Sequence, residues 1–169
     1  MDANERQGLE ARWNRFERAV VTLRDTDYAR EAQEAISDDT VHFLEALYPL
    51  WEYWCRLDPT KKRMPGQDNA VRGNRQAEIV AALAGARGGI PHDLVEFVDR
   101  TGDGYGTGRY GVGPYGVGYW AWRSYSTPRQ GYEDRNTWYA QWVDGFTISE
   151  IAVTALDWFR DQSEVQVPK

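Results

Sequence analysis

The stretch AGARGGIPHDLVEFV, residues 84–98, lies where one predicted helix gives way to the next. The residues before it, about 70–86, carry apolar side chains at helical spacing and predict a helix. Two glycines at 88–89 interrupt that pattern. The proline after them suits the first turn of a further helix over 91–100, because its missing amide is not needed there. The stretch therefore predicts a junction between two helices.

Upstream of this junction the chain predicts two longer helices. A first helix over 4–36 follows from apolar residues spaced for one face, and a second over 41–57 begins after a capping triplet, Asp38-Asp39-Thr40. A loop rich in charge and proline, 59–69, separates them from the third helix, which Asp68-Asn69 would cap. The stripe on the first helix consists of Trp13, Phe16, Val20 and Leu23.

Downstream of the junction the pattern changes twice. Residues 105–120, YGTGRYGVGPYGVGYW, repeat a Tyr-Gly-x-Gly-x unit three times, and the period then becomes two, which predicts antiparallel strands at 119–126 and 137–143. Thr147-Ile-Ser-Glu150 fits a capping box that opens a last helix. We expect a mainly α fold, a helical bundle in a single domain, 1–169. Its parts would be a four-helix core at 4–98, the repeat loop at 99–118, a small aromatic β-hairpin at 119–144 and a C-terminal helix at 147–162.

Composition narrows the class of protein. The hydrophobic fraction of 41% supports a packed core, and the net charge of −6 argues against broad, non-specific binding to nucleic acid. Basic residues cluster in 56–75, which indicates either a basic face or ordinary solvated loops. The one cysteine, Cys55, is expected to be buried, and the absence of a disulfide framework favours a reducing cytoplasm. No apolar run approaches the length of a membrane span, so we expect no membrane association.

Three sequence patterns resemble nucleotide-binding or metal-binding motifs, but each lacks residues or neighbouring elements that its motif requires. Residues 106–116 match a dinucleotide-binding glycine pattern twice, but that motif works between a strand and a helix, and here a helix is predicted before it. Residues 99–110 begin like a calcium loop, yet Tyr110 stands where a bidentate carboxylate is required. The two histidines, His42 and His92, have no cysteine or histidine neighbours at ligand spacing. We therefore expect no metal and no cofactor.

The helix junction holds the residues best suited to chemistry. Arg87 ends the third predicted helix, and His92 follows five positions later. Histidine titrates near neutral pH and serves as a general acid or base, whereas arginine keeps its charge and grips phosphate oxygens with two hydrogen bonds. Cleavage of RNA without a metal needs these two functions. A purely structural alternative is that Arg87 bonds the last carbonyls of its helix and His92 lies on the surface.

This Arg-x4-His pattern, with long helices before it, resembles the HEPN superfamily over about residues 10–98 and a C-terminal helix. The resemblance implies a small helical bundle, often a metal-independent ribonuclease of toxin or phage-defence systems, with Arg87 and His92 as catalytic residues. It also implies a homodimer in which two Arg-His pairs line one cleft, and a toxin of this kind is often held by an antitoxin. One departure is that Gly88 stands where the family usually has a polar residue, often Asn.

The aromatic repeat offers two roles. Aromatic side chains interleaved with arginine hold single-stranded RNA in many proteins, so the repeat is expected to bind substrate. The alternative is a non-catalytic module that uses its Tyr, Gly and Trp residues to bind a protein partner or to dimerise. The residues expected to contact RNA are Tyr105, Arg109, Tyr110, Tyr115 and Arg75.

Overall fold

The computed structural model describes residues 3–26, 28–29, 32–87, 94–98, 118–123 and 130–162. It confirms a mainly α fold with a small antiparallel sheet. The helices are α1 (Ala3–Asp25), α2 (Gln33–Arg56), the 3-10 turn η1 (Pro59–Lys61), α3 (Gly66–Val71), α4 (Arg75–Ala86), α5 (Glu133–Trp142) and α6 (Ile148–Asp161), and the strands are β1 (Val95–Val98) and β2 (Tyr119–Trp122).

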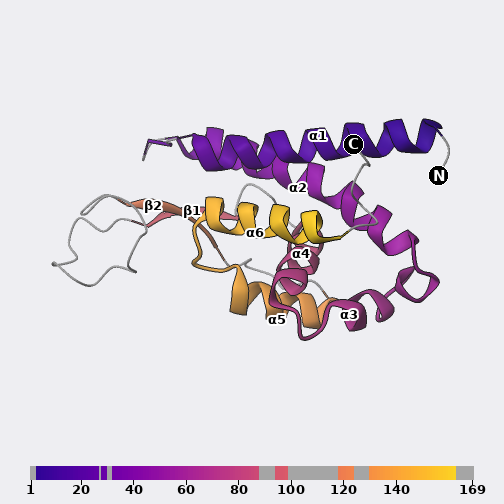
Figure 1. Cartoon of the computed structure of the whole chain (residues 1–169). Coiled ribbons are helices and arrows are strands. Elements are labelled where there is room, and N and C mark those ends of the chain that lie inside the picture. The colour runs from indigo at the N-terminus through magenta and orange to yellow at the C-terminus, as the bar shows by residue number, and fades with distance from the viewer. Residues whose placement is uncertain are drawn as a thin grey trace.

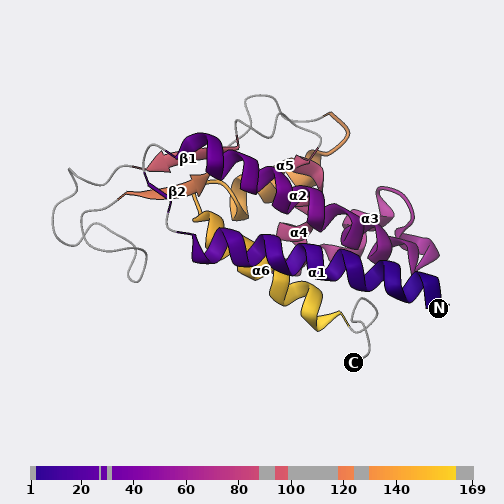
Figure 2. The same ribbon diagram turned by 90° about the horizontal axis from the view of Figure 1, so that it is seen from above.

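α1 and α2 form an antiparallel pair, and α6 packs against α1 (Figures 1 and 2). An aromatic cluster joins the three helices: the ring of Phe16 lies 5.8 Å from that of Phe43 and 5.4 Å from that of Phe159, measured between centroids. All three side chains are fully buried. Burial of rings of this size is the main source of stability in a small core.

α4 is the central helix of the bundle. Ten of its twelve residues are buried, and it contacts α2, α5 and α6. Small side chains on α4 let its neighbours approach closely. At Gly85 an added Cβ would lie 3.2 Å from Cδ of Arg135 on α5. Asn74 caps the helix by accepting a hydrogen bond from the amide of Ala77.

Several predicted helix boundaries are wrong. The first helix ends at Asp25 instead of continuing to residue 36, and α2 begins at Gln33, so the proposed cap at 38–40 lies inside α2. There the hydroxyl of Thr40 donates a hydrogen bond to the carbonyl of Ile36, so the hydroxyl has its partner within the helix. The predicted loop 59–69 contains η1 and the start of α3. Asp68 does not cap a helix but accepts a hydrogen bond from Arg135 of α5.

The predicted hairpin pairs different segments from those expected. β2 pairs antiparallel with β1, in the register Val95↔Trp122 to Val98↔Tyr119. In 94–98, the described part of the segment predicted as a helix over 91–100, the structure has the strand β1 instead. The pairing buries β2 against the bundle, where the amide of Trp122 donates to the carbonyl of Phe146, and this tertiary contact outweighs the local helix signal.

The second predicted strand, 137–143, is part of helix α5. Trp138 and Tyr139 are both buried, whereas the next two residues are exposed and Val143 is buried again. Adjacent buried residues fit a helical period and not a strand, whose neighbours point to opposite faces. The tryptophans at 138 and 142 are four residues apart, a spacing that fits either pattern when read alone.

The new pairing changes the place of the Tyr-Gly repeat in the chain. The repeat falls between β1 and β2, so it connects the two strands instead of preceding the hairpin. The residues of the repeat themselves, 105–117, lie outside the described ranges. The two-stranded ribbon lies at the end of the molecule opposite α3 (Figures 1 and 2).

The structure also tests the predicted cap of α6 and the predicted burial of Cys55. The side-chain oxygen of Thr147 accepts a hydrogen bond from the amide of Glu150, which confirms the predicted cap of α6. Cys55 is 2% exposed, which confirms its predicted burial. Among the described residues, no helix combines the length and the apolar character that crossing a lipid bilayer requires.

Candidate functional site: a cationic pocket at the end of α4

Arg87 is the residue that ends α4. Its backbone amide continues the helical pattern by donating to the carbonyl of Leu83, 3.2 Å away. Its side chain reaches across to α2, where Nε donates to a carboxylate oxygen of Glu45 at 3.2 Å. The guanidinium also lies over the ring of Tyr48, 4.3 Å from the centroid. Arg87 is therefore held in a fixed orientation, with 37% of its side chain open to solvent.

Next to Arg87 the surface opens into a pocket of about 710 Å³. Its walls come from the second half of α2, the segment from η1 to α3, the end of α4 and the start of α5. Five of the lining side chains are basic and two are acidic, so the pocket is cationic although the whole chain is acidic. The basic residues are Arg56, Lys62, Arg63, Arg87 and Arg135, the acidic ones are Glu45 and Glu52, and the aromatic ones are Tyr48, Trp51 and Tyr132.

The most deeply buried cation of the pocket is Arg135. Its Nε donates to Asp68 at 2.8 Å, and one of its terminal nitrogens donates to Gln67 at 2.7 Å. The guanidinium carbon lies 5.4 Å from the ring of Trp51 and 5.3 Å from that of Tyr132. Since both side chains of the ion pair are at most 5% exposed, Arg135 and Asp68 join α5 to α3 inside the protein.

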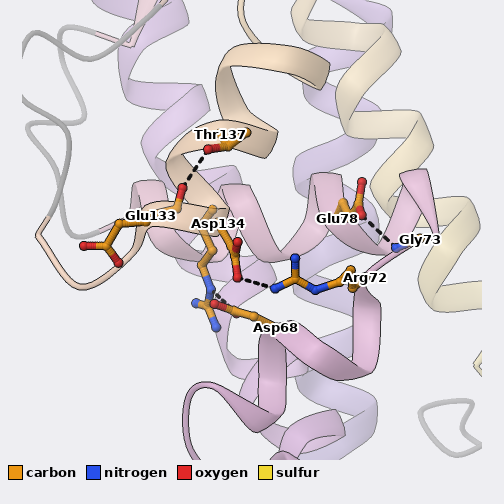
Figure 3. A network of polar contacts seen from close by, with 8 residues as sticks. Asp68, Arg72, Gly73, Glu78, Glu133, Asp134 and Thr137 are labelled. Carbon is orange, nitrogen blue, oxygen red and sulfur yellow. Dashed lines mark hydrogen bonds and ion pairs between the residues drawn. The ribbon is translucent and has the colours of Figure 1, made fainter.

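A second arginine-aspartate pair lies beside the first but outside the pocket lining. Arg72, just after α3, donates to Asp134 at the start of α5 at 2.6 Å, and both side chains are largely exposed (Figure 3). The two pairs join the same elements in different surroundings. They therefore provide a matched comparison between a pocket residue and a surface residue.

The rim of the pocket carries the exposed charges. Lys62 and Arg63 are exposed and follow η1, while Arg56 lies 3.4 Å from the carboxylate of Glu52 on the same helix. The remaining members of the basic stretch are engaged elsewhere. The ammonium of Lys61 sits 3.9 Å from the ring centroid of Trp54. The predicted basic face is therefore divided, and only part of it lines the pocket.

Two ionisable groups in the pocket have shifted pKa values. Burial raises the pKa of the Cys55 thiol to about 12, so this thiol is protonated and unreactive at neutral pH. Burial, followed by the nearby Glu52, raises the pKa of the Tyr48 phenol, which keeps that ring neutral beneath the guanidinium of Arg87. Neither group supplies a base near pH 7.

The structure places only part of the predicted site. Arg87 lines the pocket, whereas His92, Tyr105, Arg109, Tyr110 and Tyr115 lie outside the described residues. Arg75 stands at the opposite end of α4, about 18 Å along the helix axis from Arg87. There its guanidinium lies 5.1 Å from the ring of Trp142, so the structure does not bring Arg75 and Arg87 together.

Sequence reasoning missed Arg135, which lines the pocket, and its buried partner Asp68. The sequence predicts a capping role for Asp68 and places Arg135 between the two predicted strands. A buried arginine requires an acidic partner, but here the partner lies 67 positions away in sequence. A local sequence pattern therefore cannot predict that pairing.

Among the described residues, no cluster of three or more His, Cys, Asp or Glu side chains is arranged to hold a metal ion. Comparison with protein-family models, with curated proteins and with solved structures finds no match to this chain. The function proposed below therefore rests on the geometry of the pocket and the chemistry of its side chains.

Proposed function

We propose that this chain is a metal-independent endoribonuclease of the HEPN-like, toxin or phage-defence kind, with its reaction at the pocket beside Arg87. The observation that carries the proposal is the position of Arg87 at the edge of a cation-lined pocket, five residues before the one histidine of the junction. Cationic and aromatic groups around one concave surface suit the backbone and the bases of single-stranded RNA.

In the proposed reaction His92 removes the proton of a ribose 2′-hydroxyl, and the 2′-oxygen attacks the neighbouring phosphorus. The bond from phosphorus to the 5′-oxygen of the next nucleotide breaks, that oxygen takes a proton from solvent water, and His92 afterwards returns its proton to solvent. The products are a 2′,3′-cyclic phosphate and a free 5′-hydroxyl. Arg87 stabilises the negative charge that grows on the phosphate in the transition state. For this role its guanidinium exchanges the carboxylate of Glu45 for the phosphate.

The test is cleavage of a labelled single-stranded RNA by purified protein in the presence of EDTA. Arg87→Ala and His92→Ala are each expected to lower the rate at least a hundredfold, the usual scale for a transition-state contact or a general base. Arg160→Ala is the matched control, because it removes an arginine-glutamate pair of similar length, 3.3 Å to Glu17, between α6 and α1. Intact RNA with the wild-type protein contradicts the proposal.

Glu45 provides a second, opposite test. Glu45→Gln removes the carboxylate that competes with phosphate for Arg87 and adds one unit of positive charge to the pocket. Binding of RNA is expected to strengthen in this variant, by a few-fold at low salt, because the competing pair is partly exposed. Weaker binding would show that Glu45 orients Arg87 instead of competing for it.

The proposed enzyme acts as a homodimer, as the resemblance implies, and in cells an antitoxin or other protein partner would restrain it. Sedimentation equilibrium measures the mass of the assembly. Overexpression is expected to slow growth, and the Arg87 and His92 variants are expected to relieve that effect. A strictly monomeric and fully active protein would contradict the shared-cleft arrangement while leaving the reaction itself in place.

The alternative function, a non-catalytic interaction module, loses part of its basis. Trp120, Trp122 and Trp138 are at most 8% exposed, so these side chains belong to the core and do not offer a surface to a partner. That alternative now depends on the tyrosine repeat, on Gly88 in place of a polar residue and on the net acidity of the chain.

A further inference from the structure

We infer that the floor of the pocket is a phosphate-binding site, in which the guanidinium of Arg135 holds a phosphate group and Lys62 with Arg63 balances its charge. This inference deepens the proposed function and rests on it in taking RNA as the source of the phosphate. It concerns a residue that the Arg-His pair does not include. Three features of the floor support it.

The first feature is hydrogen-bonding capacity. An arginine carries five N–H donors in a fixed planar fork. Asp68 and Gln67 each accept one of them, and no further hydrogen bond joins Arg135 to another described residue. Arg135 nevertheless lines the pocket while being 3% exposed. The exposed 3% of Arg135 is the part that a ligand in the pocket can reach, so a phosphate oxygen would meet the unused donors through this small opening.

The second feature is rigidity. The guanidinium lies within 5.4 Å of the ring centroids of both Trp51 and Tyr132, and Asp68 ties it to α3. Gly85 leaves the space in which its side chain runs, since an added Cβ would meet Cδ of Arg135 at 3.2 Å. A donor group that is already fixed loses little entropy when a ligand binds, which strengthens binding.

The third feature is the distribution of charge. Asp68 neutralises Arg135, and the pocket acids Glu52 and Glu45 face Arg56 and Arg87. Two cations of the lining, Lys62 and Arg63, remain without a pocket carboxylate and are exposed at the rim. Together the floor supplies directed donors and the rim supplies net positive charge. A phosphate group needs both, and a fork of N–H donors matches its oxygens in pairs.

The test measures binding to the full-length protein, by calorimetry, of three probes: inorganic phosphate, AMP, and a 2′-O-methyl RNA oligonucleotide that cannot be cleaved and has no terminal phosphate. Arg135→Lys keeps a positive charge beside Asp68 but removes the fork. It is expected to weaken binding of every probe that the wild type binds by roughly ten- to a hundredfold, the effect of losing one or two charged hydrogen bonds. Arg72→Lys, in the exposed neighbouring pair, is the matched control and is expected to bind normally.

The probes separate the sources of the phosphate. Binding of the oligonucleotide shows that a backbone phosphodiester occupies the floor, whereas binding of AMP and phosphate without the oligonucleotide shows a terminal phosphate. A double variant, Lys62→Ala with Arg63→Ala, is expected to lower the slope of log Kd against log salt by roughly 0.7 for each lost phosphate contact. Unchanged affinity in Arg135→Lys, or a wild type that binds none of the probes, overturns the inference and leaves Arg135 as a link between α5 and α3.

Where Arg135→Lys fails to fold, the wild-type protein decides the question. The Nε–Hε resonance of Arg135 is expected to shift on titration with inorganic phosphate, while that of Arg72 stays in place. A static Arg135 resonance overturns the inference. Failure of the nuclease proposal remains distinguishable, because RNA that is bound but never cleaved removes the reaction and leaves the phosphate site. RNA that is cleaved equally fast and bound equally well by Arg135→Lys removes the site and leaves the reaction.

Discussion

At the scale of single residues, the ion pair of Arg135 and Asp68 carries the largest electrostatic consequence in the described part of the chain. Two charges that are at most 5% exposed have lost their water, and each depends on the other for compensation. The exposed pair of Arg72 and Asp134 has the shorter contact, 2.6 Å, but remains hydrated. Distance alone therefore does not rank the two pairs, whereas burial does.

The first prediction compares these two pairs. Asp68→Ala leaves Arg135 as an uncompensated buried cation and is expected to lower the free energy of unfolding by about 3–5 kcal/mol. Asp134→Ala is expected to cost about 1 kcal/mol or less, since exposed pairs contribute little. Urea denaturation of the two variants measures the difference. Equal costs would show that Arg135 reaches water when its partner is removed.

Cys55 gives a prediction that depends on pH. Burial raises the thiol pKa from 9.0 in the unfolded chain to about 12 in the folded protein. The folded state therefore holds its proton where the unfolded state has lost it, so the thiol's contribution is complete below pH 9 and declines as the pH rises toward 12.

Cys55→Ala removes this titration. The stability advantage of the wild type over the variant is expected to shrink by roughly 1.4 kcal/mol between pH 8 and pH 10, which is one pKa unit of linkage. The half-buried Tyr28, whose pKa is also raised, is present in both proteins, so its contribution cancels in the difference. Urea denaturation at the two pH values is the measurement. A constant difference between the proteins would show that the thiol reaches solvent when it ionises.

At the scale of elements, local patterns and tertiary contacts decided different parts of the fold. The apolar stripe of α1 and the cap of α6 lie within a few turns of sequence, and they predicted the existence of both helices, although α1 ends eleven residues before its predicted end at residue 36. The tryptophan spacing in 137–143 fits both a strand and a helix, and in the structure this segment is helical and packs against α4. The segment 95–98 is a strand because β2 pairs with it. Predicting this strand requires knowing which distant segment will be its partner.

The cap of α6 provides the prediction at this scale. Thr147→Ala removes the side-chain oxygen that accepts the amide of Glu150 and is expected to lower the free energy of unfolding by about 1 kcal/mol. Thr154→Ala is the matched control within the same helix, because its hydroxyl only bonds the carbonyl of Glu150 and alanine favours helix. Thermal denaturation followed by circular dichroism compares them. A control that loses as much stability as Thr147→Ala would contradict the capping role.

At the scale of the whole molecule, the candidate site combines what the sequence revealed with what only the fold assembles. The sequence predicts Arg87 as a site residue because a helix end and a nearby histidine are local features. The pocket beside it draws on α2, α3, α4 and α5, and its most buried cation, Arg135, is held by Asp68 from behind the lining. The net charge of the chain, −6, gives no sign of this cationic surface, because all but two of the acidic residues lie outside the pocket lining.

The last prediction concerns the repeat that connects the strands. The register pairs Val98 with Tyr119, so both ends of the twenty-residue connection 99–118 are anchored beside each other. Replacing 99–117 by a three-residue polar turn, with Gly118 kept against the ring of Phe97, shortens the loop about fivefold. Loop-closure entropy then favours the folded state by roughly 1 kcal/mol.

The shortened protein is expected to fold with that gain in urea denaturation and to keep binding inorganic phosphate, because the pocket is formed by other elements. Its affinity for the 2′-O-methyl RNA is expected to fall about tenfold or more, since each stacked base contributes roughly 1–3 kcal/mol and the repeat supplies the predicted stacking tyrosines. Full RNA affinity would remove the repeat from the substrate site. A large loss of stability would instead show that the repeat packs on the bundle, and the aromatic segment would then belong to the core, as the neighbouring tryptophans do.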